Sequence, residues 1–348
     1  MVPLGIRIYG LGAVALGLVG LVWGDFALQW QPVAAAFPGR TALAYLFSAA
    51  LVIAGVCVNA LKPQTAPSGA TTQTTVATRT AVLGAAALTA LYAVVVIFMH
   101  APQIFQHPGA FAAWDGAAEQ LALFAGGLAA YVRLSGANGR AGSNDVPGGT
   151  DVPGGTDPPG GTDPPGGTDP PGGTDPPGGT DPPGGTDRIG GTDRIGGRDQ
   201  LRSRDQLREQ NRLQGQIRLG RAAVIIMGVC LLMFGLAHFL YLDFTASMVP
   251  AWLPGGQKFW AAATGAAHLA AGVAFLSGIK ARLAAILLTA MFAAFSLLVH
   301  LPLLLADPHT HLSWVMNAIN LALTGAAWSI ATLLIKSTPA AQSSRRVL

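Results

Sequence analysis

Residues 283–303 read LAAILLTAMFAAFSLLVHLPL, a run without a single Asp, Glu, Lys or Arg. A helix of about 20 mostly apolar residues can cross the hydrocarbon core of a bilayer, where lipid offers no partner to backbone N–H and C=O groups. This stretch therefore predicts a transmembrane helix. The whole chain has the same character, because charged residues make up only 11% of it, against roughly 25% in an ordinary soluble domain.

Seven further stretches have similar length and apolar content. They are Ile8–Gly24, Ala42–Leu61, Thr80–His100, Gly116–Val132, Ala222–Tyr241, Phe259–Ile279 and Trp314–Ile335. We therefore predict an all-α integral membrane protein with eight transmembrane helices. The first stretch lacks a small-residue cleavage pattern, so it is interpreted as a span and not as a signal peptide.

The basic residues predict how these helices are oriented. With the N-terminus inside, all Lys and Arg residues except Arg40 and Lys258 fall in cytoplasmic segments. Cytoplasmic loops of membrane proteins carry such an excess of positive charge. We therefore expect both termini in the cytoplasm of a multi-pass protein.

The last two spans repeat the third and fourth at an offset of 200 residues. His100 corresponds to His300, Pro102 to Pro302, and the stretch 121–123, Leu-Ala-Leu, to 321–323. Spans one and two match five and six more loosely, through Asp-Phe, Pro-Gly and Ala-Gly pairs. The pattern predicts two four-helix bundles in the same orientation, which is a parallel repeat.

A repetitive segment separates the two halves. From Val146 to Asp205 the chain consists of ten hexads ending in Asp, five of them PPGGTD. These units lack an apolar position that could build a solenoid core, so they favour disorder over a calcium-binding repeat. The predicted organisation is a first bundle at 1–135, a disordered linker at 136–205, a basic juxtamembrane segment at 206–221, a second bundle at 222–337 and a cytoplasmic tail at 338–348.

The basic juxtamembrane segment predicts contact with membrane lipids. Arg208, Arg212, Arg218 and Arg221 lie directly before the fifth span, and such clusters are attracted to anionic lipids of the inner leaflet. Nucleic acid is not an expected partner, because no aromatic residues are interleaved for base stacking.

Ionisable groups within or beside the spans are the candidate site residues. Glu119 lies one turn inside the fourth span, His238 near the end of the fifth, and His268 deep in the sixth. Such groups are costly in lipid and serve as candidates for proton relay or ligand contact. For His268 a structural hydrogen bond to a neighbour such as Thr264 is an equal alternative. Further candidates at the outer side are Asp243, His100 and His300.

Metal and covalent cofactor sites are not predicted. The two cysteines, Cys57 and Cys230, are isolated in apolar segments, without a CxxC or CxxCH pattern. The spacing of His309 and His311 is not specific for zinc or iron.

Part of the second half resembles the DoxX-like family of four-helix membrane proteins. The resemblance covers about 221–300 and rests on the stretch 235–239, GLAHF, on 248–254, MVPAWLP, and on the Thr-Gly and Ala-Gly pairs that follow Trp260. Where many such sequences carry an acidic residue in the second helix, this chain has His268. The family takes its name from a membrane subunit of a thiosulfate:quinone oxidoreductase, so the resemblance implies a bacterial inner-membrane protein linked to quinone.

These observations lead to one functional hypothesis and one alternative. The hypothesis is a quinone-linked membrane subunit of an oxidoreductase, working with a soluble or membrane redox partner. Its quinone would contact His238, Asp243, His268 and Glu119. The alternative is a non-enzymatic carrier of small solutes or lipids, or a membrane scaffold.

Overall fold

The computed structural model describes residues 4–60, 71–143 and 192–335, and these are helical or in short connections, with no strand among them. Contacts divide the chain into two units, residues 1–141 with 213–348, and residues 142–212. The first unit holds both predicted halves and a single continuous core. The fold and the site below belong to this unit.

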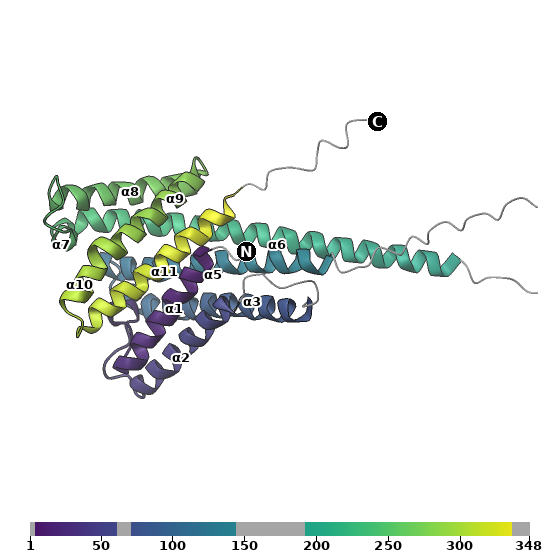
Figure 1. Cartoon of the computed structure of the whole chain (residues 1–348), viewed down its shortest axis with the longest axis horizontal. Helices are drawn as coiled ribbons and strands as arrows, with labels where there is room; N and C mark the ends of the chain where they lie inside the picture. Colours follow the sequence, from purple (N-terminus) through teal and green to yellow (C-terminus); the bar gives the residue numbers. More distant parts are fainter. Residues whose placement is uncertain (1–3, 61–70, 144–191, 336–348) are drawn as a thin grey trace, which may run out of the picture. The chain divides into compact units, whose positions relative to one another are not determined.

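Figure 1 shows the helices in chain order. The helices of the first half are α1 (Leu4–Trp23), the short 3₁₀ segment η1 (Leu28–Trp30), α2 (Arg40–Asn59), α3 (Thr71–Val94), the π segment η2 (Val95–His100), α4 (Ala101–Gln106) and α5 (Phe111–Ser143). Those that follow are α6 (Thr192–Leu240), α7 (Leu242–Met248), α8 (Gln257–Ser277), α9 (Ala281–Phe295), the π segment η3 (Ser296–His300), α10 (Leu301–Ala306) and α11 (His311–Leu333).

Six helical stretches of the described chain are long and apolar enough to cross a membrane. They are Leu4–Trp23, Arg40–Asn59, Val76–Gln106, Gln206–Leu240, Gln257–Ser277 and Ala281–Ala306. The prediction of a multi-pass, all-α membrane protein is confirmed at this level. The fourth and eighth predicted spans correspond to α5 and α11, which lie outside this set.

The position of α11 explains its lower hydropathy. Figure 1 shows α1 between α2 and α11, and α11 also packs against α9. Most of α11 is buried, including the polar side chains of Asn320, Thr324 and Ser329. A helix surrounded by protein can carry polar side chains that hydrogen-bond locally, whereas a lipid-facing helix cannot do so without cost.

Small residues allow the helices to approach closely. A Cβ atom added at Gly12 would lie 2.5 Å from the backbone of Ala322, and one added at Gly84 would lie 2.7 Å from the carbonyl oxygen of Ala54. These contacts join α1 to α11 and α3 to α2. Side chains at these glycines would force the helices apart.

Proline explains the two π segments. Pro102 and Pro302 follow η2 and η3 by two residues. Because proline has no N–H, it cannot complete the regular ladder of hydrogen bonds from residue i to residue i−4. The residues before it therefore adopt the wider π pattern of hydrogen bonds. The loop after each π segment contains an equivalent hydrogen bond. The indole N–H of Trp114 donates to the Pro108 carbonyl oxygen (3.0 Å), and the indole N–H of Trp314 donates to the Pro308 carbonyl oxygen (2.9 Å).

The prediction of disorder at 136–205 is wrong at both ends. Helix α5 continues to Ser143 and α6 begins at Thr192. The sequence from 200 to 221 is rich in Gln, Leu and Arg, which are good helix formers. Residues 144–191, with all the PPGGTD hexads, and residues 336–348, with the predicted tail at 338–348, lie outside the described residues.

Candidate functional site

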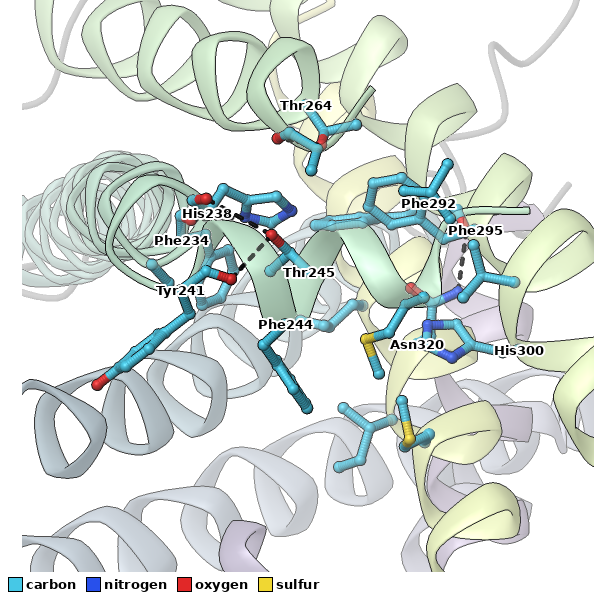
Figure 2. A pocket seen from close by; sticks show the side chains of 18 of the residues that line it. Phe234, His238, Tyr241, Phe244, Thr245, Thr264, Phe292, Phe295, His300 and Asn320 are labelled. Carbon is cyan, nitrogen blue, oxygen red and sulfur yellow. Dashed lines mark hydrogen bonds between the residues drawn. The ribbon is translucent and has the colours of Figure 1, made fainter. Parts of the chain in front are cut away.

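A cavity of about 860 Å³ opens among α5, α6, α7, α8, α9, η3 and α11. Ligand pockets in proteins typically measure about 300–1,000 Å³. Much of its wall is aromatic, and Figure 2 shows several of these rings. The aromatic lining residues are Trp30, Phe234, Tyr241, Phe244, Trp260, Phe292 and Phe295.

His268 lies in this wall and is only 2% exposed. Its Nδ1–H donates to the carbonyl oxygen of Thr264, one turn earlier in α8, at 3.0 Å. Because the ring hydrogen faces a carbonyl, the Nε2 atom of the neutral ring is an acceptor. Among the described residues this Nε2 atom is buried and has no hydrogen-bond partner.

Aromatic rings surround the imidazole of His268. The ring centroid of Phe234 lies 5.8 Å away in an edge-on arrangement, and that of Phe292 lies 5.7 Å away. The ring of His238 lies 5.1 Å away. These contacts fix the orientation of His268 from both α6 and α9.

The packing of α8 against α6 places His268 and His238 side by side. The buried residues Gly265, His268 and Gly272 share one face of α8. A Cβ atom at Gly265 would lie 2.8 Å from the Cβ atom of His238, and one at Gly272 would lie 2.8 Å from a methyl group of Leu232. His268 therefore faces the other helices together with these two glycines.

The π segment η3 brings His300 to the cavity. A π turn contains more residues than an α turn, so it rotates the following side chains relative to a regular helix. Asn317 of α11 donates to the His300 carbonyl oxygen (2.8 Å), while Asn320 donates to the Phe292 carbonyl oxygen (2.9 Å) and to the Ser296 hydroxyl (2.6 Å). These bonds hold η3 against α11, and the buried Nδ1 atom of His300 has no partner among the described residues.

Two carboxyl groups enter the same cavity from α5. Asp115 and Glu119 are four residues apart, which places them on one face of the helix. One oxygen of each, Oδ1 of Asp115 and Oε2 of Glu119, is buried without a partner among the described residues. Within the described chain no Lys or Arg side chain lines the cavity. The polar part of the site therefore consists of histidines, carboxyl groups, one asparagine, one glutamine and the hydroxyl groups of Tyr241, Thr245 and Thr264.

The structure brings together four of the six predicted site residues. His238, His268, Glu119 and His300 all line the cavity. His100 does not: it is 2% exposed, and its Nε2–H donates to the carbonyl oxygen of Trp30 at 3.1 Å. It contributes to the site only by holding the backbone of Trp30, whose side chain lines the cavity.

The candidate Asp243 is not among the residues that line the cavity, so the structure does not place it with His238, His268 and Glu119. Its carboxylate pairs with Lys258 at 2.8 Å, and the two side chains are 85% and 71% exposed. Asp243 follows His238 by five residues and lies in the first turn of α7, a new helix after a break at Tyr241. The spacing expected for one continuous helix therefore does not predict the direction of the Asp243 side chain.

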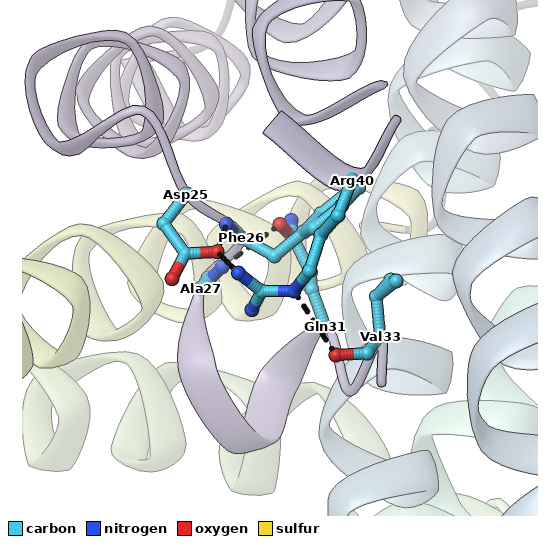
Figure 3. A network of polar contacts seen from close by, with 6 residues as sticks. All are labelled: Asp25, Phe26, Ala27, Gln31, Val33 and Arg40. Carbon is cyan, nitrogen blue, oxygen red and sulfur yellow. Dashed lines mark hydrogen bonds and ion pairs between the residues drawn. The ribbon is translucent and has the colours of Figure 1, made fainter. Parts of the chain in front are cut away.

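The α1–α2 loop contributes Gln29 and Trp30 to the cavity and is held by a polar network, shown in Figure 3. Asp25 pairs with Arg40, whose Nε–H also donates to the Val33 carbonyl oxygen at 3.2 Å. The backbone N–H of Ala27 donates to the side chain of Gln31 at 3.1 Å. These contacts link both ends of the loop.

Sequence reasoning missed Asn320, Trp30 and the aromatic wall. Asn320 could have been found by the rule that selects His268, because an amide within an apolar helix is also costly in lipid. Trp30 and the phenylalanines gave no signal, since such residues are common in any membrane span or interface. As for metals, the described residues contain no group of three or more His, Cys, Asp or Glu that could hold an ion.

Comparison with known proteins adds one match. A family model described as "Domain of unknown function (DUF8561)" matches residues 227–331. The matched segment contains the histidines, Asn320 and most of the aromatic wall, but not the α5 carboxyl groups or Trp30. No curated protein and no solved structure matches the chain.

Proposed function

We propose that this protein binds the headgroup of a quinone in the cavity, as a membrane subunit of a quinone-linked oxidoreductase. One observation carries the proposal: His268 keeps a buried, unpartnered Nε2 atom in an aromatic cavity. A buried polar atom without a partner costs about 1–3 kcal/mol. A ligand that hydrogen-bonds to Nε2 removes this cost.

The headgroup of a quinone suits the chemistry of the wall. It is a flat ring that can stack on Phe234, Phe292 or Phe295, and it carries two oxygen atoms at opposite ends. Figure 2 shows His238 and His300 on different sides of the view. Polar groups on different walls of an apolar slot can meet both ends of such a ring.

The proposal gives this chain the binding of quinone and the exchange of protons with it. His268, His238 and the carboxyl groups can accept protons from a reduced headgroup. The two electrons are assigned to a separate soluble or membrane redox partner. This division agrees with the resemblance of residues 221–300 to the DoxX-like family.

The same proposal places the chain in a bacterial inner membrane with both termini in the cytoplasm and with lipid contacts at the basic segment 206–221. It includes eight spans, since α5 and α11 contain 33 and 23 residues and about 20 residues are enough to cross a bilayer. It also includes a parallel repeat. The π segments that end at His100 and His300 and the matching Trp–Pro hydrogen bonds support the repeat.

A carrier of lipids or small solutes is the second candidate, and a scaffold is the third. The interruption of a cavity wall by η3 favours a carrier, because carrier sites are often formed by irregular helices. A carrier would hold its ligand without regard to redox chemistry. Binding of a quinone analogue therefore separates the candidates.

The test uses the full chain in lipid nanodiscs. Decylubiquinone, in its oxidised and its reduced form, is titrated by calorimetry against the parent protein and against His268→Leu. Binding of either form, weakened about tenfold or more by His268→Leu, is the expected result; tenfold corresponds to about 1.4 kcal/mol.

His107→Leu is the matched control, because His107 is an exposed loop histidine outside the cavity. It should bind as the parent does, and thermal unfolding of both variants checks that they are folded. If the parent binds neither form, the quinone proposal fails and the carrier or scaffold becomes the better account.

A further inference from the structure

We infer that the cavity selects the reduced, hydroxyl-bearing form of its ligand, a quinol, over the oxidised quinone. This inference rests on the proposed function and adds which redox form the site recognises. It rests on the partners of the hydrogen-bond donors in the cavity wall.

Both histidines on the α6 and α8 side use their ring hydrogen within their own helix. His268 donates Nδ1–H to Thr264, and His238 donates Nδ1–H to the carbonyl oxygen of Phe234 at 2.8 Å. In each case the neutral ring is left with Nε2 as a lone-pair acceptor. The two rings lie 5.1 Å apart, so their acceptors belong to the same part of the site.

The other polar side chains on α8 and α11 also donate their hydrogen bonds to groups of the protein itself. Asn320 uses its amide hydrogens on Phe292 and Ser296, which leaves its oxygen as an acceptor. The hydroxyl of Thr264 donates to carbonyl oxygens of its own helix, at 2.8 Å for Trp260. The indole N–H of Trp260 donates to the Pro254 carbonyl oxygen at 2.7 Å.

Donors remain on Gln29, Trp30 and Tyr241, and on the ring of His300, which carries one N–H when it is neutral and for which the described residues give no partner at Nδ1. None of these four residues belongs to α8 or α11, the helices that carry His268 and Asn320. On the α5 wall, Asp115 and Glu119 each have one buried carboxyl oxygen without a partner among the described residues, which accepts a hydrogen bond when the group is ionised and can donate one when it is protonated. The part of the cavity around His268 therefore presents acceptors and has its donors occupied.

A ligand that pairs with acceptors must bring its own donors. A quinone has only carbonyl oxygens, so against His268 it would place one acceptor opposite another and leave both unpaired. A quinol has a hydroxyl at each end of the ring and can donate to Nε2. Unpaired polar groups are most costly where water is excluded. We therefore expect the cavity to bind the quinol more tightly than the quinone.

The test compares the affinities of decylubiquinol and decylubiquinone for the full chain in nanodiscs, under anaerobic conditions, by calorimetry. We expect the quinol to bind at least tenfold more tightly. His268→Asn should abolish the preference, because a short amide can still donate to Thr264 but no longer reaches the ligand with an acceptor. His268→Gln places an amide donor near the Nε2 position and should improve binding of the quinone.

His107→Leu should keep the preference of the parent. Equal binding of the two forms, or tighter binding of the quinone, overturns the inference while leaving the quinone proposal intact. A preference for quinol that survives His268→Asn also overturns it, since selectivity then comes from elsewhere. Absence of binding for both forms overturns the inference together with the proposed function.

Discussion

The imidazole rings of His268 and His238 lie 5.1 Å apart at an angle of 41°, although they come from different helices. Each ring is oriented by the same local device, an Nδ1–H that donates to the carbonyl oxygen four residues earlier in its helix. The pairing of two such rings depends on the close contact of α8 with α6. The geometry of the site is thus set by backbone packing as much as by the histidines.

Gly265→Ala tests this dependence. The added Cβ atom would lie 2.8 Å from that of His238, so α8 must move away from α6. We expect a loss of about 1–3 kcal/mol in stability and weaker ligand binding, measured by thermal unfolding and calorimetry. Gly109→Ala is the control, because nothing lies within 4 Å of its added Cβ atom. Unchanged binding in Gly265→Ala would mean that the spacing of the rings does not matter.

Asp243→Asn tests whether Asp243 takes part in ligand binding. The carboxylate pairs with an exposed Lys258 and does not line the cavity. We expect ligand affinity to stay within twofold of the parent in the calorimetric titration. A fall comparable to that of His268→Leu would return Asp243 to the binding site.

Arg40→Gln tests whether the α1–α2 loop supports the cavity. The change removes the ion pair with Asp25 and the bond to the Val33 carbonyl oxygen, and with them the contact of the guanidinium with the ring of Phe26 at 5.8 Å. Because the pair is partly exposed, we expect a stability loss of only about 1 kcal/mol. We also expect weaker ligand binding in the calorimetric titration, since Gln29 and Trp30, which line the cavity, belong to this loop.

A double-mutant cycle with Asp25→Asn provides the control for that prediction. If the two side chains act through each other, the double variant should cost less than the sum of the single variants. Additive losses would show that Arg40 acts through Val33 or Phe26 instead.

Cysteine labelling tests the predicted orientation. A cysteine placed at Gly109 should react with an impermeant thiol reagent in intact cells, and one placed at Gly154 should react only after the cells are opened. The distribution of Lys and Arg is the reason for this expectation. The parent protein controls for its own Cys57 and Cys230. The reverse labelling pattern would overturn the topology.

Deletion of residues 144–191 tests whether the hexads contribute to the stability of the helical part of the chain. These repeats contain no position that could build an apolar core. We expect the shortened chain to unfold at the same temperature as the parent in detergent. A large decrease would show that the segment packs against the helices.

Helix positions could be predicted because their signal is local. The apolar stretch at 283–303 became α9, η3 and α10, and the predicted span Phe259–Ile279 became α8 at Gln257–Ser277. Lipid requires every backbone group in such a stretch to be bonded within the helix, so length and hydropathy are sufficient. The common face of Gly265, His268 and Gly272 is local in the same sense, because their spacing depends only on helical periodicity.

The cavity required contacts that no local pattern encodes. Asp243 turns away because the chain breaks at Tyr241, and η3 alters the periodicity that would otherwise predict the direction of His300. Trp30 and Glu119 reach histidines more than 100 positions later in the chain only through the packing of α5 and of the α1–α2 loop. The sequence by itself thus determined which segments are helical and which groups are costly to bury. Only the tertiary structure decided which of those groups share a cavity, because small differences in helix phase and approach redirect a side chain completely.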